Sequence, residues 1–573
     1  MLLALGGGAI AAAPGQDAIA EAEAAIEKGD GLGAEMAGRR ALEEGASRDQ
    51  VAAYIGEGEL LQGQLYDARD WLEDADFDAR TRKRGLHALA RLELAQGDLP
   101  AAAQAFDRLL QSGPADALVW VDIGRMRYLA GEHHGALEAA RRAVRLDRQE
   151  PRALEFFALL VRDGQGLNAA LPLFHDALQI APEDMGLLGQ YAATLGDAGQ
   201  HGEMLRVARK MLEIDGRDSN AFFMQAVLAA RAGQNDLARS LMWHLAPEQQ
   251  MVPAAIMLTA ILEYRSGNYA LAAENFDQLV RLQPVNDTAR LMFARALLAN
   301  GEANEVIAML AARADRPDAS NYLLTLIARA HEQLGQRDQA AVYLDRAARM
   351  VRPSLAPRPT YLERDPSGRA RDGANPVIRI RQSIDEGRMA EAQQASAALL
   401  ERFPGSIDLG LLSGDVSLLA GDPGTALVRY RHAAQVRNNW PLVQRMVAAL
   451  VQQGEHIQAR RVLAGYLAQN PRDSAAAALL GTMQRDAANP ARAALLLRHA
   501  AASAPGSLDP LLLSDLAELE LVVGDQAQAQ LHAQAAHRLQ RGNRRVAAAL
   551  ARVYDMRAGQ ERIAQVLMDK ANP

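Results

Sequence analysis

The feature that most constrains the fold of this chain is a glycine that recurs every 34 residues. Ten lattice points spaced from Gly97 carry glycine at nine positions, and the tenth, Gln165, stands between Gly164 and Gly166. Because glycine makes up only 45 of 573 residues, composition does not explain this regularity. The lattice glycines are Gly29, Gly63, Gly97, Gly131, Gly199, Gly233, Gly267, Gly301 and Gly335. A fixed period of this length predicts a stack of similar supersecondary units.

Each lattice point is followed by two positions whose side-chain size recurs from repeat to repeat. The residue five positions on is usually small, and the residue four positions later is large and apolar in most copies. Residues four apart share one face of an α-helix, so a small residue there lets a neighbouring helix approach without overpacking. The small positions are Ala34, Ala68, Ala102, Ala136, Ala170, Met204, Ala238, Ala272, Val306 and Ala340. The large positions are Leu72, Phe106, Phe174, Met242, Phe276, Leu310 and Leu344. Met204 and Val306 are not small, and we expect looser packing in their two repeats.

A first helix precedes each glycine. In the clearest copy Trp120, Ile123, Gly124 and Tyr128 follow helical spacing. The glycine then falls where one helix ends and the chain turns, a place that favours left-handed backbone angles. Proline, as at Pro114, marks the end of the second helix. Each unit is therefore predicted to be a helical hairpin.

This pattern resembles the tetratricopeptide repeat, whose period is 34 residues and whose W..LG..Y, A...F and P positions match those above. The resemblance implies an all-α fold, an α-solenoid of stacked antiparallel helix pairs with about sixteen repeats in two arrays forming a right-handed superhelix. It also implies that the first helix of each pair lines a concave, partner-binding surface.

The register divides the chain into four segments. Residues 14–351 hold a first array of about ten repeats, and residues 377–573 hold a second, less regular array of about six. Residues 352–376 break the register with five prolines and five arginines, and we interpret them as a connector. The second array continues the small position at Ala392, Ala426, Ala459, Ala493, Ala529 and Ala564.

Composition excludes several classes of protein. A net charge of −8 argues against a general nucleic-acid binder. With no cysteine, disulfide frameworks, thiolate zinc sites and cysteine nucleophiles are impossible. A hydrophobic content of 49% with 23% charged residues is that of a packed chain and not a disordered one.

The amino-terminal run bears on localisation. Residues 2–13, LLALGGGAIAAA, are uncharged and end in Ala11-x-Ala13, which is similar to a signal-peptidase site. The run is too short to cross a bilayer, which takes about 20 residues. We therefore expect residues 1–13 to be the remnant of a signal peptide and the protein to reach the bacterial periplasm or cell envelope, with the cytoplasm as the alternative. No transmembrane segment is expected.

No stretch of the sequence carries the spacing of a catalytic, cofactor or metal site. The run from Asp74 to Asp78 begins like a calcium loop, but the required glycine position is Ala79. His331 and Glu332 begin a zincin-like string, yet the second histidine position is Gly335. We expect no enzymatic activity, no cofactor and no metal.

The resemblance places a set of candidate partner-binding residues on the concave surface. They are Arg91, Arg125, Tyr128, Tyr264, Arg295, Tyr322, Arg329 and Arg381. Arginines one repeat apart, such as Arg91 with Arg125 and Arg295 with Arg329, would stack into a basic ladder that suits carboxylates. The alternative is that these arginines lie along the groove and pair with neighbouring acidic residues.

The sequence thus predicts a non-catalytic scaffold or adaptor that binds a protein or peptide partner in a concave groove, in the assembly of a bacterial cell-envelope or secretion complex. No nucleic acid is expected among its partners. Two alternatives stay open: a binder of an anionic polymer or glycan through the groove arginines, and a regulatory subunit of a neighbouring enzyme.

Overall fold

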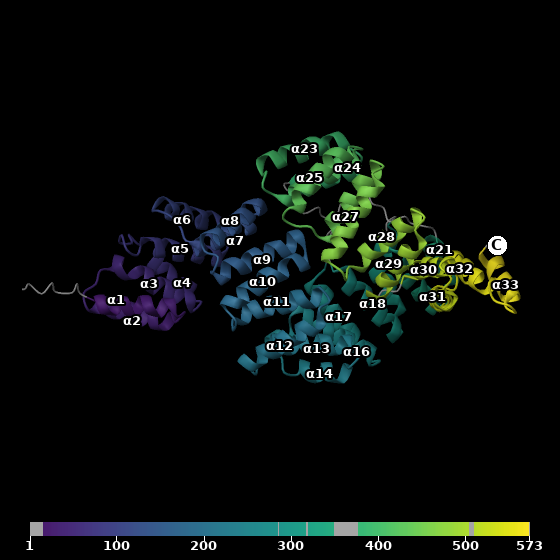
Figure 1. The fold of residues 1–573 in the computed structure, drawn as a ribbon, viewed down its shortest axis with the longest axis horizontal. Helices are drawn as coiled ribbons and strands as arrows, with labels where there is room; N and C mark the ends of the chain where they lie inside the picture. Colours follow the sequence, from purple (N-terminus) through teal and green to yellow (C-terminus); the bar gives the residue numbers. More distant parts are fainter. Residues whose placement is uncertain (1–14, 285, 317–318, 349–375, 504–508, 572–573) are drawn as a thin grey trace, which may run out of the picture. The chain divides into compact units, whose positions relative to one another are not determined.

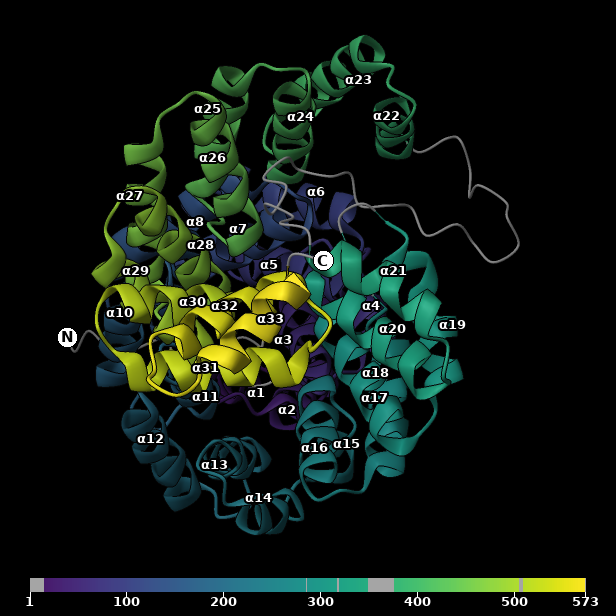
Figure 2. The ribbon, with the colours of Figure 1, turned by 90° about the vertical axis from the view of Figure 1, so that its right-hand side faces the viewer.

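A computed structural model describes residues 15–571 apart from 285, 317–318, 349–375 and 504–508. These residues form 33 helices, which are sixteen hairpins of a first and a second helix plus the short helix α15 (Pro247–Gln250) between the seventh and eighth hairpins (Figure 1; Figure 2). The all-α fold of stacked helix pairs is thus confirmed. Within the described residues, an isolated bridge between Glu132 and Ser406 is the only extended pairing.

The helices have the following bounds. The first helices of the hairpins are α1 (Gln16–Glu27), α3 (Arg48–Leu61), α5 (Arg82–Gln96), α7 (Ala117–Leu129), α9 (Pro151–Gln165), α11 (Met185–Asp197), α13 (Ser219–Arg231), α16 (Pro253–Arg265), α18 (Asp287–Asn300), α20 (Asn321–Gln333), α22 (Pro376–Asp385), α24 (Ile407–Leu419), α26 (Trp440–Gln452), α28 (Ser474–Asp486), α30 (Pro510–Val522) and α32 (Arg544–Asp555). The second helices are α2 (Gly31–Glu43), α4 (Leu65–Leu72), α6 (Leu99–Gln111), α8 (His133–Leu146), α10 (Leu167–Ile180), α12 (His201–Ile214), α14 (Asn235–Met242), α17 (Tyr269–Leu282), α19 (Ala303–Ala314), α21 (Arg337–Ala348), α23 (Met389–Arg402), α25 (Pro423–Ala434), α27 (His456–Gln469), α29 (Pro490–Ser503), α31 (Gln526–Leu539) and α33 (Glu561–Ala571).

The lattice glycines make the turns inside the hairpins. Gly97 has a φ of 81°, a left-handed angle at which a Cβ is unfavourable, and the side chain of Asp98 then caps α6 by accepting from the Ala101 amide at 2.9 Å. Ala488 occupies the matching turn between α28 and α29 with a φ of 57° and is the only described non-glycine residue with a positive φ.

The small lattice positions lie inside the stack, as predicted. Ala102 is fully buried, and Phe106 on the same face of α6 is 2% exposed. Met204 and Val306 occupy the same position and are also buried, and the looser packing expected of their two repeats stays a prediction. The first helix compensates for the larger Met204: a Cβ on Gly196 would lie 2.5 Å from the Met204 sulfur.

By its internal contacts the chain forms two compact units. Unit 1 comprises Met1–Leu160 and Phe403–Asp408, and unit 2 comprises Val161–Arg402 and Leu409–Pro573. Unit 2 therefore contains repeats of both predicted arrays. The predicted connector and residues 1–13 lie outside the described residues, apart from Pro376, the first residue of α22. The array boundaries stay predictions.

Repeats of the two predicted arrays touch each other within unit 2. The Asn438 amide donates to the Asp163 carbonyl at 2.7 Å, and the Asn168 side chain donates to the Ala468 carbonyl at 2.9 Å. A Cβ on Gly164 would lie 2.9 Å from the Val436 carbonyl oxygen, so glycine permits this close approach.

Candidate functional site

Six of the eight predicted partner-binding residues line two separate hollows. In unit 1, α5 carries Arg91 and α7 carries Arg125. In unit 2 the remaining four come from α16, α18 and α20, and are Tyr264, Arg295, Tyr322 and Arg329. All six stand on first helices, the helices that the family resemblance assigned to the concave surface.

The unit 1 hollow has a volume of about 610 Å³ and is lined by residues from α1, α3, α5 and α7. Arg91 contacts the Glu57 carboxylate of the preceding repeat at 3.1 Å, and Arg84 contacts the same carboxylate at 3.4 Å. Arg125 lies 3.6 Å from Asp122. In this unit the arginines are therefore paired with acidic neighbours, the second of the two predicted arrangements.

Asp122 is one of the acidic residues that line that hollow, and it contacts two of the basic ones. Its carboxylate lies 2.8 Å from His87 Nε2. Burial acts to raise the pKa of Asp122, but the hydrogen bond from His87 and the charges of His87, Arg91 and Arg125 outweigh it, and the pKa lies below its usual value. The carboxylate thus stays charged and holds its basic neighbours in place.

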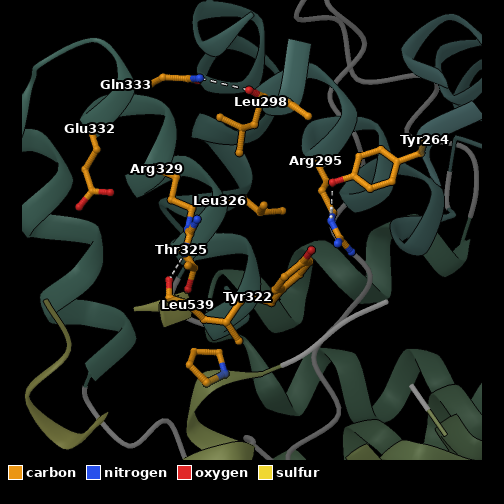
Figure 3. Close-up of a pocket in the computed structure, with 12 residues that line it drawn as sticks. Tyr264, Arg295, Leu298, Tyr322, Thr325, Leu326, Arg329, Glu332, Gln333 and Leu539 are labelled. Carbon is orange, nitrogen blue, oxygen red and sulfur yellow. Dashed lines mark hydrogen bonds between the residues drawn. The ribbon is translucent and has the colours of Figure 1, made fainter. Parts of the chain in front are cut away.

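The unit 2 groove has a volume of about 650 Å³ and carries two arginines with two tyrosines (Figure 3). The Arg295 guanidinium lies 4.9 Å from the centre of the Tyr264 ring, and Arg295 Nε donates to the Tyr264 hydroxyl at 3.0 Å. Burial raises the pKa of Tyr322, against the opposing influence of the nearby Arg295. Arg295 is thereby fixed between two aromatic side chains that face the groove.

Arg329, one repeat further on, has partners that the sequence did not reveal. Its Nη2 donates to the Leu539 carbonyl (Figure 3) and, at 3.1 Å, to the Arg538 carbonyl, both at the end of α31. Leu539 and Pro510, which lie more than 170 residues further along the chain, complete the wall of the groove. No local periodicity signals a contact over such a separation.

The two remaining candidates are placed elsewhere. The Tyr128 ring packs edge-on against His133 with 5.0 Å between the ring centres. Arg381 lies on α22, and neither residue lines the two hollows described above. Tyr128 therefore has a packing role inside its hairpin.

The motifs that failed as metal sites have structural roles. Asp78 Oδ1 accepts from the Thr81 amide at 2.8 Å and so closes the turn before α5. His331 Nδ1 lies 2.7 Å from Gln336 Oε1, and its ring stacks on Tyr343. Among the residues that the structure describes, no group of three or more potential ligands could hold a metal ion. None of the described helices combines the length and apolar character needed to cross a membrane.

Models of known protein families match several of these repeats. Family profiles described as tetratricopeptide repeat match residues 87–151, 257–321 and 417–482. No curated protein sequence matches the chain.

Solved structures of low similarity also match. The anaphase-promoting complex hetero-tetramer Cut9-Hcn1 is 12% identical, over 98% of this chain and 97% of that one, with a TM-score of 0.41. The human IFIT1 dimer with PPP-AAAA is 16% identical over 68% and 90%, with a TM-score of 0.35. Pseudomonas aeruginosa PilF is 18% identical over 34% and 88%, with a TM-score of 0.30.

The family assignment rests on the profiles together with the helix lattice. The profiles match repeats on both sides of the predicted connector, and the described helices continue the same hairpin pattern through sixteen pairs. The chain therefore contains tetratricopeptide repeats.

Proposed function

We propose that this protein is a non-catalytic scaffold whose unit 2 groove binds an extended, carboxylate-bearing segment of a protein partner. The observation that carries the proposal is the grouping of Tyr264, Arg295, Tyr322 and Arg329 along a groove of about 650 Å³. Tyrosine and arginine are the residue types that dominate binding energy in protein interfaces.

The fixed position of Arg295 supports this proposal. Its guanidinium is held over the Tyr264 ring and by the Tyr264 hydroxyl, so little side-chain entropy is lost when a carboxylate binds. A planar guanidinium binds a carboxylate by donating two parallel hydrogen bonds to its two oxygens. Glu332 is the only acidic residue among those lining the groove, against two arginines.

A defined experiment tests the groove. A photo-reactive amino acid at Ala299, which lines the groove, should capture the partner from an envelope extract. Arg295→Ala or Tyr322→Ala should reduce the capture at least about tenfold, the loss expected for a hot-spot side chain. Arg281→Ala is the matched control, because Arg281 is 79% exposed on the second helix α17 and pairs with Asp277. Equal capture by all variants would refute the assignment.

The anionic-polymer alternative differs in its dependence on salt. An anionic polymer or glycan would bind to unneutralised groove arginines, and its binding would weaken steeply with salt and disappear in an Arg91→Ala, Arg125→Ala double variant. The pairing of Arg91 with Glu57 and of Arg125 with Asp122 favours the protein segment instead. The regulatory-subunit alternative would be tested by co-purification with the products of neighbouring genes.

We further propose that the protein acts in the bacterial cell envelope, at an assembly or secretion complex. The support is the apolar run at residues 2–13 with its small-residue end. Cell fractionation and amino-terminal sequencing of the mature protein test it. A cytosolic product that retains Met1 would contradict it.

A further inference from the structure

The end of α31 and the turn that follows it form a polar interface with α20. We call residues Leu539 to Asn543 the corner. Gln540 is 2% exposed and Asn543 is fully buried, although both side chains are polar. Gln540 Nε2 donates to the Thr325 hydroxyl of α20, and its Oε1 accepts from Asn543 Nδ2. Buried amides with matched partners indicate a specific contact between these elements.

Arg329 adds a second point of attachment. The last carbonyls of a helix have no partners within the helix and carry the negative end of its dipole. Arg329 Nη2 donates to two of these carbonyls, those of Arg538 and Leu539. Nη2 of Arg329, a donor that a partner carboxylate would meet at this point of the groove, is thus engaged by the chain itself.

The corner is also closely fitted against α21. A Cβ on Gly542 would lie 3.2 Å from the Leu344 side chain, closer than ordinary van der Waals contact. The corner therefore covers the Thr325 and Arg329 part of the groove, while Arg295 on α18 lies one repeat away and Tyr264 on α16 lies two repeats away.

We propose that the corner is a built-in competitor of the partner for Arg329, so that full binding in the unit 2 groove requires the corner to leave α20. This inference rests on the proposed function and concerns the regulation of the same site. In the closed state a ligand contacts the Arg295 half only. In the open state Arg329 exchanges two carbonyl acceptors for a carboxylate, which forms a stronger, charge-assisted hydrogen bond.

The closed state, in which the corner contacts α20, can be fixed by a site-specific cross-link. Because it contains no cysteine, a Thr325→Cys, Gln540→Cys double variant of the full chain has only two thiols, at side chains that contact each other in the closed state. A short bifunctional thiol reagent would then link the corner to α20. The released state is represented by Gln540→Ala, and Gln534→Ala is its matched control, because Gln534 donates to the Tyr554 hydroxyl, away from the groove.

Fluorescein-labelled hexaglutamate is the probe, and its affinity is measured by anisotropy at low salt. We expect Gln540→Ala to bind it about tenfold more tightly than the wild type, the shift expected from the loss of one buried hydrogen bond that holds the corner. The linked chain should bind no more tightly than the wild type, Gln534→Ala should match the wild type, and Arg329→Ala added to Gln540→Ala should remove the gain.

Hydrogen exchange of the corner gives a second readout. Saturating hexaglutamate should speed exchange of the Gln540 to Asn543 amides in the wild type but not in Arg329→Ala. Equal affinity of the wild-type, Gln540→Ala and linked chains, with unchanged exchange, would refute the competitor while leaving the proposed function intact. Absence of binding to every variant, the released one included, would refute the proposed function and this inference with it.

Discussion

Replacing Glu59 by glutamine should remove a pH dependence from the stability of the first repeats. Glu59 lies on α3 with its side chain 1% exposed. Its Oε1 accepts from Arg39 at 2.9 Å, whereas its Oε2 is buried without a hydrogen-bond partner. Burial, assisted by the nearby Glu35 carboxylate, raises the pKa of Glu59 from 4.5 to about 7.

The direction in which the free energy of unfolding changes with pH depends on whether the folded or the unfolded chain binds the proton more tightly. Because the pKa of Glu59 is higher in the folded chain, only the folded chain holds this proton between pH 4.5 and about 7. The free energy of unfolding therefore decreases as the pH rises through that window and stays lower above it. The rise of the pKa from 4.5 to about 7 corresponds to about 3 kcal/mol in total, because each tenfold change in proton affinity is worth about 1.4 kcal/mol.

Hydrogen exchange of the α2–α4 amides at several pH values measures this effect locally, which matters because repeat proteins open piece by piece. The Glu59→Gln chain should lose the slope between pH 4.5 and 7. Glu35→Gln is a control of opposite sign: a hydrogen bond from Gln62, with the contribution of Arg39, lowers the pKa of Glu35, so its charge stabilises the fold at neutral pH. Identical slopes in the wild type and Glu59→Gln would refute the reasoning.

Three further substitutions test the lattice. Ala488→Gly should raise the protection of α28 and α29 by about 0.5–1 kcal/mol, since relief of a left-handed angle outweighs the added entropy of the unfolded chain. Gly454→Ala should lower stability locally by about 1 kcal/mol through its backbone alone, because an added Cβ would meet no atom within 4 Å; opposite results would contradict the turn assignment. Ala102→Leu should cost about 1–3 kcal/mol by overpacking a fully buried position, whereas Gln104→Leu on the exposed face of α6 should be nearly silent, and equal melting temperatures would contradict this.

The repeat period predicts the hairpins because their causes are local. A glycine such as Gly97 marks a left-handed turn wherever it falls on the lattice, and Ala102 marks the buried stripe of the helix that follows. Ala488 shows the limit of that signal. Neighbouring hairpins impose the same turn on a residue that disfavours it, so tertiary packing overrides local preference there.

The candidate site was predicted only in part. The family resemblance placed Arg91 and Arg295 on first helices, where they are found, but their partners depend on the neighbouring repeat. Arg91 pairs with Glu57, whereas Arg295 stacks on Tyr264. The first arrangement neutralises the arginine and the second orients it, and no spacing rule distinguishes the two.

The sequence alone determined the hairpin unit, its period and the residues that bury its inner face, because each is set by contacts within one or two repeats. Only the tertiary structure decided that Arg329 donates to carbonyls at the end of α31, and that Gln540 meets Thr325. Those contacts join residues about 210 positions apart. Their formation depends on the accumulated rotation of many hairpins, which a 34-residue pattern does not encode.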